Sequence, residues 1–520
     1  ETVKSTENRV EEPLVVTAPP RIATLHLRYM RRVLVTLAAA LGLAVPIVGA
    51  PASPASAAPT DIVAVIVDGV GNGHGRGMSQ WGAYGRAVDQ GQTWVQILDA
   101  YYGGTSNGSI GNPQIKVRLT ALDGAGTVGL VSHGGGVTWG TATYSSMQAV
   151  RNGSSFDIYG STSISCAVSS TLVVPDGPLV KGDQGDAVRQ IQQFLTVFGF
   201  DPGGVDGDFG NLTEGAVLRF QADRGLPQDG QWRIEEANAA RALISSGSGG
   251  TFTKIGTSAA PTFTTAASAS APDALGLCQP NGSVVHYRGA LEVSNQSGST
   301  RVVNAVDTEN YLRGVVPKEV SASWAQAGGG RGAQAVQAQA VAARSYGAQQ
   351  NRYAPYATTC DTQSCQVYGG AATRAVSTGP ATLVEDFRTD QAIAATAGVV
   401  RMWNGTTDIV STEFSASNGP RTAGGVFPAI DDPADAIANN PNHRWTRVLD
   451  ADALAARYGL GSLTSASMVE AVESRYRPGG RPYDGIWFDD IVLTGSNGAT
   501  KQMNAWDFRS DHGLPSPGFT

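Results

Sequence analysis

Glu319 is a carboxylic acid with sequence neighbours that suit acid–base chemistry. It lies between the apolar run Val-Val-Pro at residues 315–317 and Val320, with Trp324 close behind. Partial burial among such residues raises the pKa of a carboxyl group, which then stays protonated near neutral pH and can act as an acid. The charge of Lys318 would oppose that shift. A solvated surface glutamate is the alternative interpretation.

Other polar residues outside this segment could contact a ligand. His74 stands in a run of glycines, where the backbone can approach a ligand closely, although the glycines could instead form a tight turn that His74 only caps. Ser415, Ser417 and Arg421 form a second group, which suits ligand contacts and a structural turn equally.

Arg344 lies in an alanine-rich segment, residues 332–349, which is predicted to be helical. A large cation among small side chains has room to reach a site, although an ordinary surface arginine is the alternative. Gln339 and Tyr346 lie in the same segment and are weaker candidates for residues that line the site.

The elements that must position these residues predict a mixed α+β fold. Short alternating apolar runs between glycine-rich turns predict antiparallel strands over residues 114–165. Residues 307–350 are predicted to be helical, with Asp307 or Thr308 as the N-cap. Further predicted elements are a strand at 61–67, a helix at 94–101, strands from about 284 onward and a strand at 490–494.

Residues 178–244 have a different pattern. Apolar residues recur at helical spacing over 187–198, and two more helices follow after turns rich in Gly and Asp. The pattern predicts a small separate unit of three helices. The Ser-, Gly-, Ala- and Thr-rich sequence that follows, residues 245–277, has the composition of a flexible linker.

The composition bounds the location and partners of the protein. A net charge of −7 gives no basic surface for nucleic acid. Met30 and the pair Arg-Arg at 31–32 precede an apolar stretch at 33–48 and the small residues Ala-Ser-Ala at 55–57. This is the layout of a secretory signal peptide, with a membrane anchor as the alternative. It predicts a secreted protein and leaves residues 1–58 outside the fold.

The four cysteines are an even count, which in an exported protein favours two disulfides. Sequence alone permits three pairings. The spacing suggests a local pair, Cys360–Cys365, and a long-range pair, Cys166–Cys278. Free buried thiols are the alternative.

The three-helix unit carries a spaced set of turn and core residues: Asp-Gly-Asp-Phe-Gly at 206–210, Thr213, Val217, Phe220, Gln221, Leu226 and Asp-Gly at 229–230. On this set it resembles the peptidoglycan-binding domain type 1 family. The resemblance implies that the unit recognises cell-wall peptide or glycan in a groove.

A longer series of motifs runs through the second half of the chain: Asn-Ala-Val-Asp-Thr-Glu-Asn-Tyr-Leu-Arg-Gly-Val-Val-Pro-Lys-Glu at 304–319, Ala-Gln-Ala-Val-Ala-Ala-Arg-Ser-Tyr at 338–346, Cys-Asp-Thr-Gln-Ser-Cys at 360–365 and Ser-Ala-Ser-Asn-Gly-Pro-Arg at 415–421. In this order the motifs resemble the SpoIID/LytB family (stage II sporulation protein D).

That resemblance implies a lytic transglycosylase of the cell wall. Such an enzyme cuts the glycan between N-acetylmuramic acid and N-acetylglucosamine and leaves a 1,6-anhydro sugar, here with Glu319 as its single acid and base. A hydrolase would instead need two carboxylates about 5 to 9 Å apart and would leave reducing ends. The alternative from another class is a non-catalytic wall-binding protein that stimulates an amidase.

The resemblance also implies roles for other residues. It places Arg344 and the loop of His74 at the catalytic groove and makes Ser415, Ser417 and Arg421 candidates for sugar contacts. Trp81 could stack on a sugar or fill the core, and the core is favoured. Zinc, which some family members bind near the cysteines, is disfavoured, because no histidine accompanies the cysteine pair at 360–365 and two thiolates fall short of four ligands. No metal or other cofactor is expected.

One motif stands in an unusual place. The run Gly-His-Gly-Arg-Gly-Met-Ser-Gln, which normally closes the family's domain, lies here at residues 73–80, ahead of the other motifs. We interpret this as a circular permutation, so the strand at 61–67 should pack beside the C-terminal segment near Phe519. The predicted order is therefore a first SpoIID-like part at 61–166, the inserted unit at 178–244, the linker at 245–277 and the main SpoIID-like part at 278–520.

Overall fold

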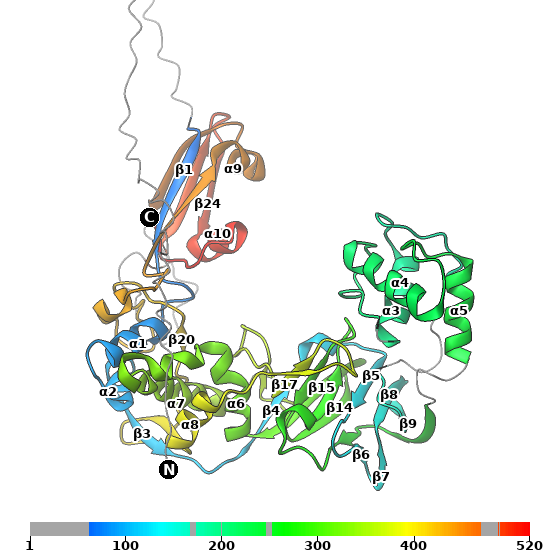
Figure 1. Ribbon diagram of the computed structural model, residues 1–520. Coiled ribbons are helices and arrows are strands. Elements are labelled where there is room, and N and C mark those ends of the chain that lie inside the picture. Colours follow the sequence, from blue (N-terminus) through cyan, green and yellow to red (C-terminus); the bar gives the residue numbers. More distant parts are fainter. Residues whose placement is uncertain (1–61, 167–172, 199, 246–251, 470–486, 488) are drawn as a thin grey trace, which may run out of the picture. The chain divides into compact units, whose positions relative to one another are not determined.

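The computed structural model describes residues 62–166, 173–198, 200–245, 252–469, 487 and 489–520 (Figure 1). The predicted signal peptide and the first residue of the predicted strand at 61–67 lie outside the described residues. No helix in the described ranges is long and apolar enough to cross a membrane.

Two mainly antiparallel sheets form the β part of the largest core. The first has eight strands in the order β10 (Thr253–Ser258), β9 (Ser155–Ser161), β8 (Ser146–Asn152), β5 (Thr127–Val131), β12 (Leu275–Cys278), β13 (Val284–Tyr287), β17 (Ala372–Arg374) and β18 (Ala381–Leu383). The second has five, in the order β11 (Thr262–Phe263), β14 (Ala290–Gln296), β15 (Ser299–Asp307), β4 (Gln114–Arg118) and β16 (Thr359–Cys360). The antiparallel strands predicted over 114–165 are thus confirmed.

The expectation of a flexible linker over 245–277 is wrong for most of that segment. Strand β10 pairs with β9, β11 pairs with β14, and β12 joins β5 to β13. Phe263, Leu275 and Leu277 are buried in the core of the two sheets. The composition misled because these few apolar residues are enough to anchor strands whose other positions are small and polar.

A cluster of helices packs partly on this core and partly around a second hydrophobic core. It contains α1 (Gln80–Val88), α2 (Trp94–Tyr101), α6 (Thr308–Glu319), α7 (Ala333–Gln349) and α8 (Phe387–Ala395), and the short helix η3 (Ala322–Gly330). Helix α7 contacts all the others and is buried over most of its length. Its alanines are small, so the neighbouring helices can approach it closely. The predicted helix at 94–101 is confirmed.

Both ends of the described chain meet in another core. Strand β1 (Ala64–Val70) pairs with β21 (Arg444–Asp450) on one side. On its other side Asp68 and Thr520 exchange two backbone hydrogen bonds (3.1 and 2.8 Å), and Gly69 bridges to Phe519. The predicted contact between this strand and the C-terminal segment is confirmed. The remaining elements of this core are α9 (Ala451–Tyr458), β22 (Leu463–Val469), β23 (Asp490–Gly495), β24 (Thr500–Asn504) and α10 (Ala505–His512).

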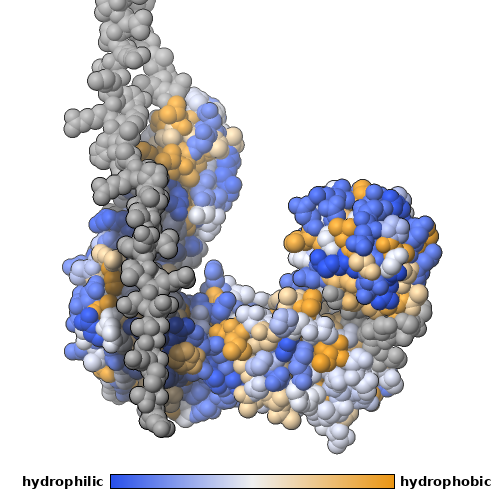
Figure 2. All heavy atoms as spheres, in the orientation of Figure 1, coloured by the Kyte–Doolittle hydropathy of each residue, from blue (hydrophilic) through white to orange (hydrophobic). Residues whose placement is uncertain are grey.

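Helices α3 (Asp186–Val197), α4 (Asn211–Arg224) and α5 (Ile234–Ser245) form a small unit with a hydrophobic core of its own. Two glutamines hold its turns in the same way: the side chain of Gln192 accepts from Gly207 N, and that of Gln221 accepts from Gly230 N (2.8 and 3.0 Å). Apolar and hydrophilic residues are interspersed on the face of this unit seen in Figure 2. The prediction of a small three-helix unit is confirmed.

The two predicted disulfides are confirmed. Cys166 is bonded to Cys278 and Cys360 to Cys365, and no cysteine is free. The first bond joins the segment after β9 to the end of β12, so it ties together the two chain segments between which the three-helix unit is inserted.

Candidate active site

Glu319 is the last residue of helix α6. The helix begins at the N-cap Asp307, whose carboxylate accepts from Asn310 N (3.0 Å), and it ends where Val320 turns to extended backbone. Pro317 in the last turn has no N–H and therefore makes no helical hydrogen bond there. The side chain of Glu319 thus leaves the helix at its end and is partly buried.

Two donors from distant parts of the chain hold the carboxylate of Glu319. The backbone N–H of Val367 donates to Oε1 (3.1 Å), and the side-chain amide of Gln80 donates to Oε2 (3.2 Å). Burial raises the pKa of Glu319, and the two hydrogen bonds, which favour the charged form, lower it by less. Lys318 is exposed and is not among the groups that shift the pKa of Glu319, so the predicted opposition does not arise.

Gln80 reaches Glu319 because of the glycine-rich loop before it. Every second residue of the loop is a glycine with positive φ, and a Cβ on Gly73 or Gly77 would collide with Ser415 or with the backbone of Glu413. The glycines therefore let the loop lie against residues 413–417 of the chain itself. Strands β2 (Met78–Ser79) and β20 (Phe414–Ser415) continue this contact as a parallel pair, and α1 then begins at Gln80.

His74 is fixed in one orientation by the same loop. Its Nδ1 accepts from Arg76 N and from the hydroxyl of Ser415, both at 3.0 Å. Burial, reinforced by the charge of Arg76, lowers the pKa of His74 to about 4. The imidazole is therefore neutral at pH 7 and carries its proton on Nε2, where it can donate to a ligand.

Comparison with protein families gives two matches. Residues 296–403 match the family described as SpoIID, Stage II sporulation protein, and residues 184–232 match the family described as Putative peptidoglycan binding domain. The chain contains a SpoIID domain and a peptidoglycan-binding domain. It is thus a cell-wall-related, peptidoglycan-binding protein. No solved structure matches the chain.

Arg344 of the SpoIID domain has a different position from the one predicted. Its side chain is 0% exposed and forms a two-pronged ion pair with Glu309 (2.9 and 2.7 Å). It also donates to the backbone oxygens of Val399 and Ile393 (3.1 and 3.4 Å). A guanidinium enclosed in this way cannot contact a substrate. It instead ties the start of α6 to α7, α8 and strand β19 (Val399–Trp403), which corrects the expectation of a substrate contact.

The three residues predicted as a group at 415–421 have different surroundings in the structure. Ser415 lies against His74, also accepts from Gly75 N (3.1 Å), and is nearly buried. Ser417 is fully buried and donates to Asp435 (2.8 Å), so its role is structural and the predicted sugar contact is corrected. Arg421 forms a surface ion pair with Asp431 (2.5 Å).

Gln339 and Tyr346 both face the interior side of α7. Gln339 is fully buried, and neither atom of its amide has a hydrogen-bond partner among the described residues. Tyr346 is partly buried and contacts Phe414 of β20 edge-on, with ring centroids 6.4 Å apart. Tyr311 lies on helix α6, and burial, followed by the charge of Glu319, raises its pKa.

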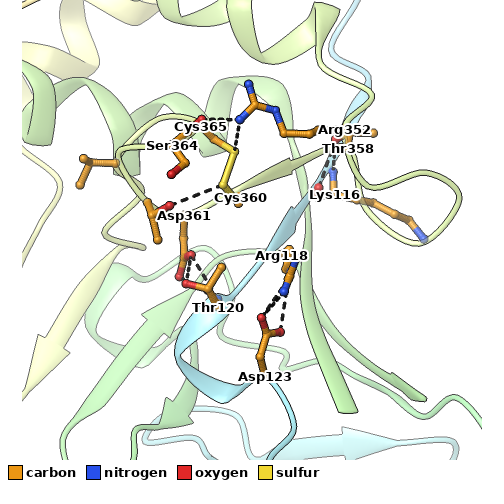
Figure 3. Close-up of a disulfide and its surroundings, with 12 residues drawn as sticks. Lys116, Arg118, Thr120, Asp123, Arg352, Thr358, Cys360, Asp361, Ser364 and Cys365 are labelled. Carbon is orange, nitrogen blue, oxygen red and sulfur yellow. Dashed lines mark hydrogen bonds and ion pairs between the residues drawn. A yellow bond between two sulfur atoms is a disulfide. The ribbon is translucent and has the colours of Figure 1, made fainter. Parts of the chain in front are cut away.

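The Cys360–Cys365 disulfide joins the end of strand β16 to the loop that follows it (Figure 3). Val367, which donates to Glu319, comes two residues after Cys365. Arg352 donates to the backbone oxygen of Ser364 (2.5 Å), and Thr120 of the short helix η1 (Thr120–Leu122) donates to the neighbouring Asp361 (2.8 Å). Sulfurs in a disulfide are not thiolates and do not ligate zinc. Among the described residues no group of three or more His, Cys, Asp or Glu could hold a metal ion.

Sequence reasoning missed three residues that shape the site. Gln80 closes the glycine-rich motif, so its place in that motif was an available signal. Val367 contributes only a backbone N–H, which no sequence pattern reveals. Asp435 accepts from Ser79 (2.5 Å) and Ser417, and thereby joins the loop before α1 to residues 415–418. It stands in an ordinary Pro-Ala-Asp-Ala turn, η4 (Pro433–Ala436).

Proposed function

We propose that the protein is a lytic transglycosylase that cuts the glycan strand of peptidoglycan with Glu319 as its acid and base. The observation that carries the proposal is the position of Glu319: a partly buried carboxyl group at a helix end, with a raised pKa and two fixed donors. The match to SpoIID supports it, and the peptidoglycan-binding domain supports the substrate.

The proposed reaction needs a single carboxyl group. Protonated Glu319 donates its proton to the glycosidic oxygen between N-acetylmuramic acid and N-acetylglucosamine, and the bond from that oxygen to the anomeric carbon breaks. The resulting carboxylate takes the proton of the 6-hydroxyl of the same muramic acid, whose oxygen bonds to the anomeric carbon. The products are a 1,6-anhydro end and a free 4-hydroxyl, and no water is consumed.

The surroundings of Glu319 fit this two-stage role. Burial favours the protonated acid, whereas Gln80 and Val367 stabilise the carboxylate once the proton has left. Among the described residues no other carboxylate hydrogen-bonds to Glu319 or is among the groups that shift its pKa, which fits a reaction that needs a single carboxyl group. Neutral His74 can donate from Nε2 to a sugar oxygen.

We also propose that the SpoIID fold is circularly permuted and that the protein works outside the cytoplasm, at the cell wall. The loop at 73–80 follows β1, which pairs with the last residues of the chain, and Gly73 N donates to Pro515 O (3.1 Å). In the unpermuted order, the C-terminal segment would run directly into this loop, and the fold would need little rearrangement to allow it. Two disulfides and the peptidoglycan-binding domain support an extracellular location.

The test is digestion of purified glycan strands by the wild type and by Glu319→Gln, with mass spectrometry of the products. The wild type should generate 1,6-anhydro ends and Glu319→Gln should not. Glu235→Gln, which removes an exposed carboxylate from α5, is the charge-matched control and should cut normally.

Two results would contradict the proposal. Reducing ends in place of anhydro ends would indicate hydrolysis. Absence of any cleavage by the wild type, with binding to peptidoglycan retained, would favour a non-catalytic protein that stimulates an amidase.

A further inference from the structure

Helix α1 buries its small side chains and leaves its large aromatic side chains partly exposed. Its buried residues are mainly small: Gly82, Ala83, Gly85 and Ala87, together with Gln80. Its large aromatic residues, Trp81 and Tyr84, are only partly buried. A helix that packs by the hydrophobic effect alone would bury its aromatic residues first.

The small residues of α1 are required by close packing. A Cβ on Gly82 would collide with the hydroxyl of Tyr101 and the carboxylate of Asp432, and one on Gly85 would collide with the backbone of Ala434. The inward face of α1 therefore has no room for an aromatic ring. This packing explains the glycines, and Tyr84 packs with part of its surface against a hydrophobic core. Neither observation gives a reason for the partly exposed Trp81.

A third aromatic residue joins the two on α1. Trp324 stacks on Tyr84, with ring centroids 4.5 Å apart and an interplanar angle of 23°, and lies 4.9 Å from Trp81. It belongs to η3, a helix with no buried residue, and is itself partly exposed. Three partly exposed rings from two segments thus form one cluster.

The aromatic cluster is formed by chain segments that directly adjoin the candidate catalytic residue and one of its donors. Trp81 directly follows Gln80, whose amide is 3.2 Å from Glu319, and Trp324 follows Glu319 by five residues. Pyranose rings in a β-linked strand expose flat faces of C–H groups, which pack on the negatively polarised faces of aromatic rings. Ligand sites commonly combine such apolar surfaces with a few fixed polar groups.

We propose that Trp81, Tyr84 and Trp324 form a sugar-binding subsite that holds the glycan strand beside Glu319. The occupant is a β-1,4-linked chain of N-acetylated hexosamines, and the proposal rests on the proposed function for that identity. The hydroxyl of Tyr84 adds a polar contact at the edge of the rings. The subsite binds neutral sugar rings and needs no peptide stem.

The test measures binding to chitohexaose, a soluble β-1,4-linked oligomer of N-acetylglucosamine, by the full chain carrying Glu319→Gln and 5-fluorotryptophan. In fluorine NMR the signals of Trp81 and Trp324 should shift on titration. The signal of Trp139, at the end of the hairpin strand β6 (Val137–Trp139), should not. Trp81→Ala should weaken binding about tenfold, equivalent to about 1.4 kcal/mol.

Conservative variants separate binding from folding. Trp81→Phe keeps an aromatic face and should weaken binding by about threefold or less, and Trp139→Phe should leave it unchanged. Shifts of Trp81 and Trp324 without cleavage by the wild type would uphold the subsite and reject the proposed reaction. Cleavage without these shifts, or a shift confined to Trp232 in the peptidoglycan-binding domain, would reject the subsite and leave the reaction standing.

Discussion

Breaking the buried ion pair between Arg344 and Glu309 should destabilise the fold and leave the activity of the folded protein unchanged. The motif around Arg344 implies a substrate contact, whereas the structure encloses the guanidinium completely. The two assignments predict opposite results. A substrate-binding arginine can be replaced with little effect on stability and a large effect on activity, and an enclosed structural arginine behaves the other way round.

The magnitudes follow from the burial of each partner. Glu309→Gln leaves a cation that is 0% exposed without a counter-charge, which costs about 3–5 kcal/mol. Arg344→Met leaves a carboxylate that is 23% exposed and still accepts from Gly398 N, so it can be partly rehydrated. Arg344→Met should therefore lower the free energy of unfolding by about 3 kcal/mol, the lower end of that range. The double variant should cost less than the sum of the two, because neither charge is then left alone.

The assay is urea unfolding of the three variants, followed by the intrinsic tryptophan fluorescence of the full chain. A loss of about 3 kcal/mol is a large part of the 5–15 kcal/mol that stabilises a typical domain, so the shift in midpoint should be plain. Activity should be measured on glycan strands below the unfolding transition and should fall only as far as the folded fraction does. The structural assignment is refuted if Arg344→Met unfolds at the wild-type midpoint while its KM for glycan rises strongly.

Three further predictions concern other contacts of the site. Gln80→Met removes a donor that stabilises the charged form of Glu319, so the pKa of Glu319 should rise. The alkaline limb of the pH–rate profile should therefore move to higher pH. The control is Gln90→Met, because Gln90 is exposed. His74 should show no titration by nitrogen NMR between about pH 5.5 and 8. Because folding lowers its pKa from 6.5 to about 4, the unfolded chain binds the extra proton first, and His74 should lower the stability of the fold as the pH drops from about 6.5 towards 4. A midpoint near 6.5 would contradict the burial of the ring. Replacing Cys166 and Cys278 together by serine removes a link between residues 112 positions apart, and chain entropy sets an upper limit of about 4–5 kcal/mol on the resulting loss of stability. Hydrogen exchange should rise in β5 and β12 and stay unchanged in α3 to α5, which have their own core.

The sequence by itself predicted most of the local elements and suggested the two disulfide pairings. Helix α2, the three helices of the inserted unit and the antiparallel strands were predicted because periodicity and turn residues act over a few positions. The composition of 245–277 failed as a signal, because an edge strand such as β10 needs only its backbone and a few side chains in contact with a neighbour. The pattern of residues around Glu319 made it the candidate acid, but it did not indicate the donors that hold its carboxylate.

Only the tertiary structure decided which polar residues share the site. Gln80 and Glu319 are 239 positions apart, and they meet because glycines let the loop before α1 lie against residues 413–417. Arg344 and Ser417 belong to the same motifs as the site residues, yet both are enclosed and bonded to buried or partly buried carboxylates. A motif records which residues stay together along the chain, whereas exposure to a ligand depends on what packs over each side chain. That packing involves segments from both ends of the chain, and no local pattern contains it.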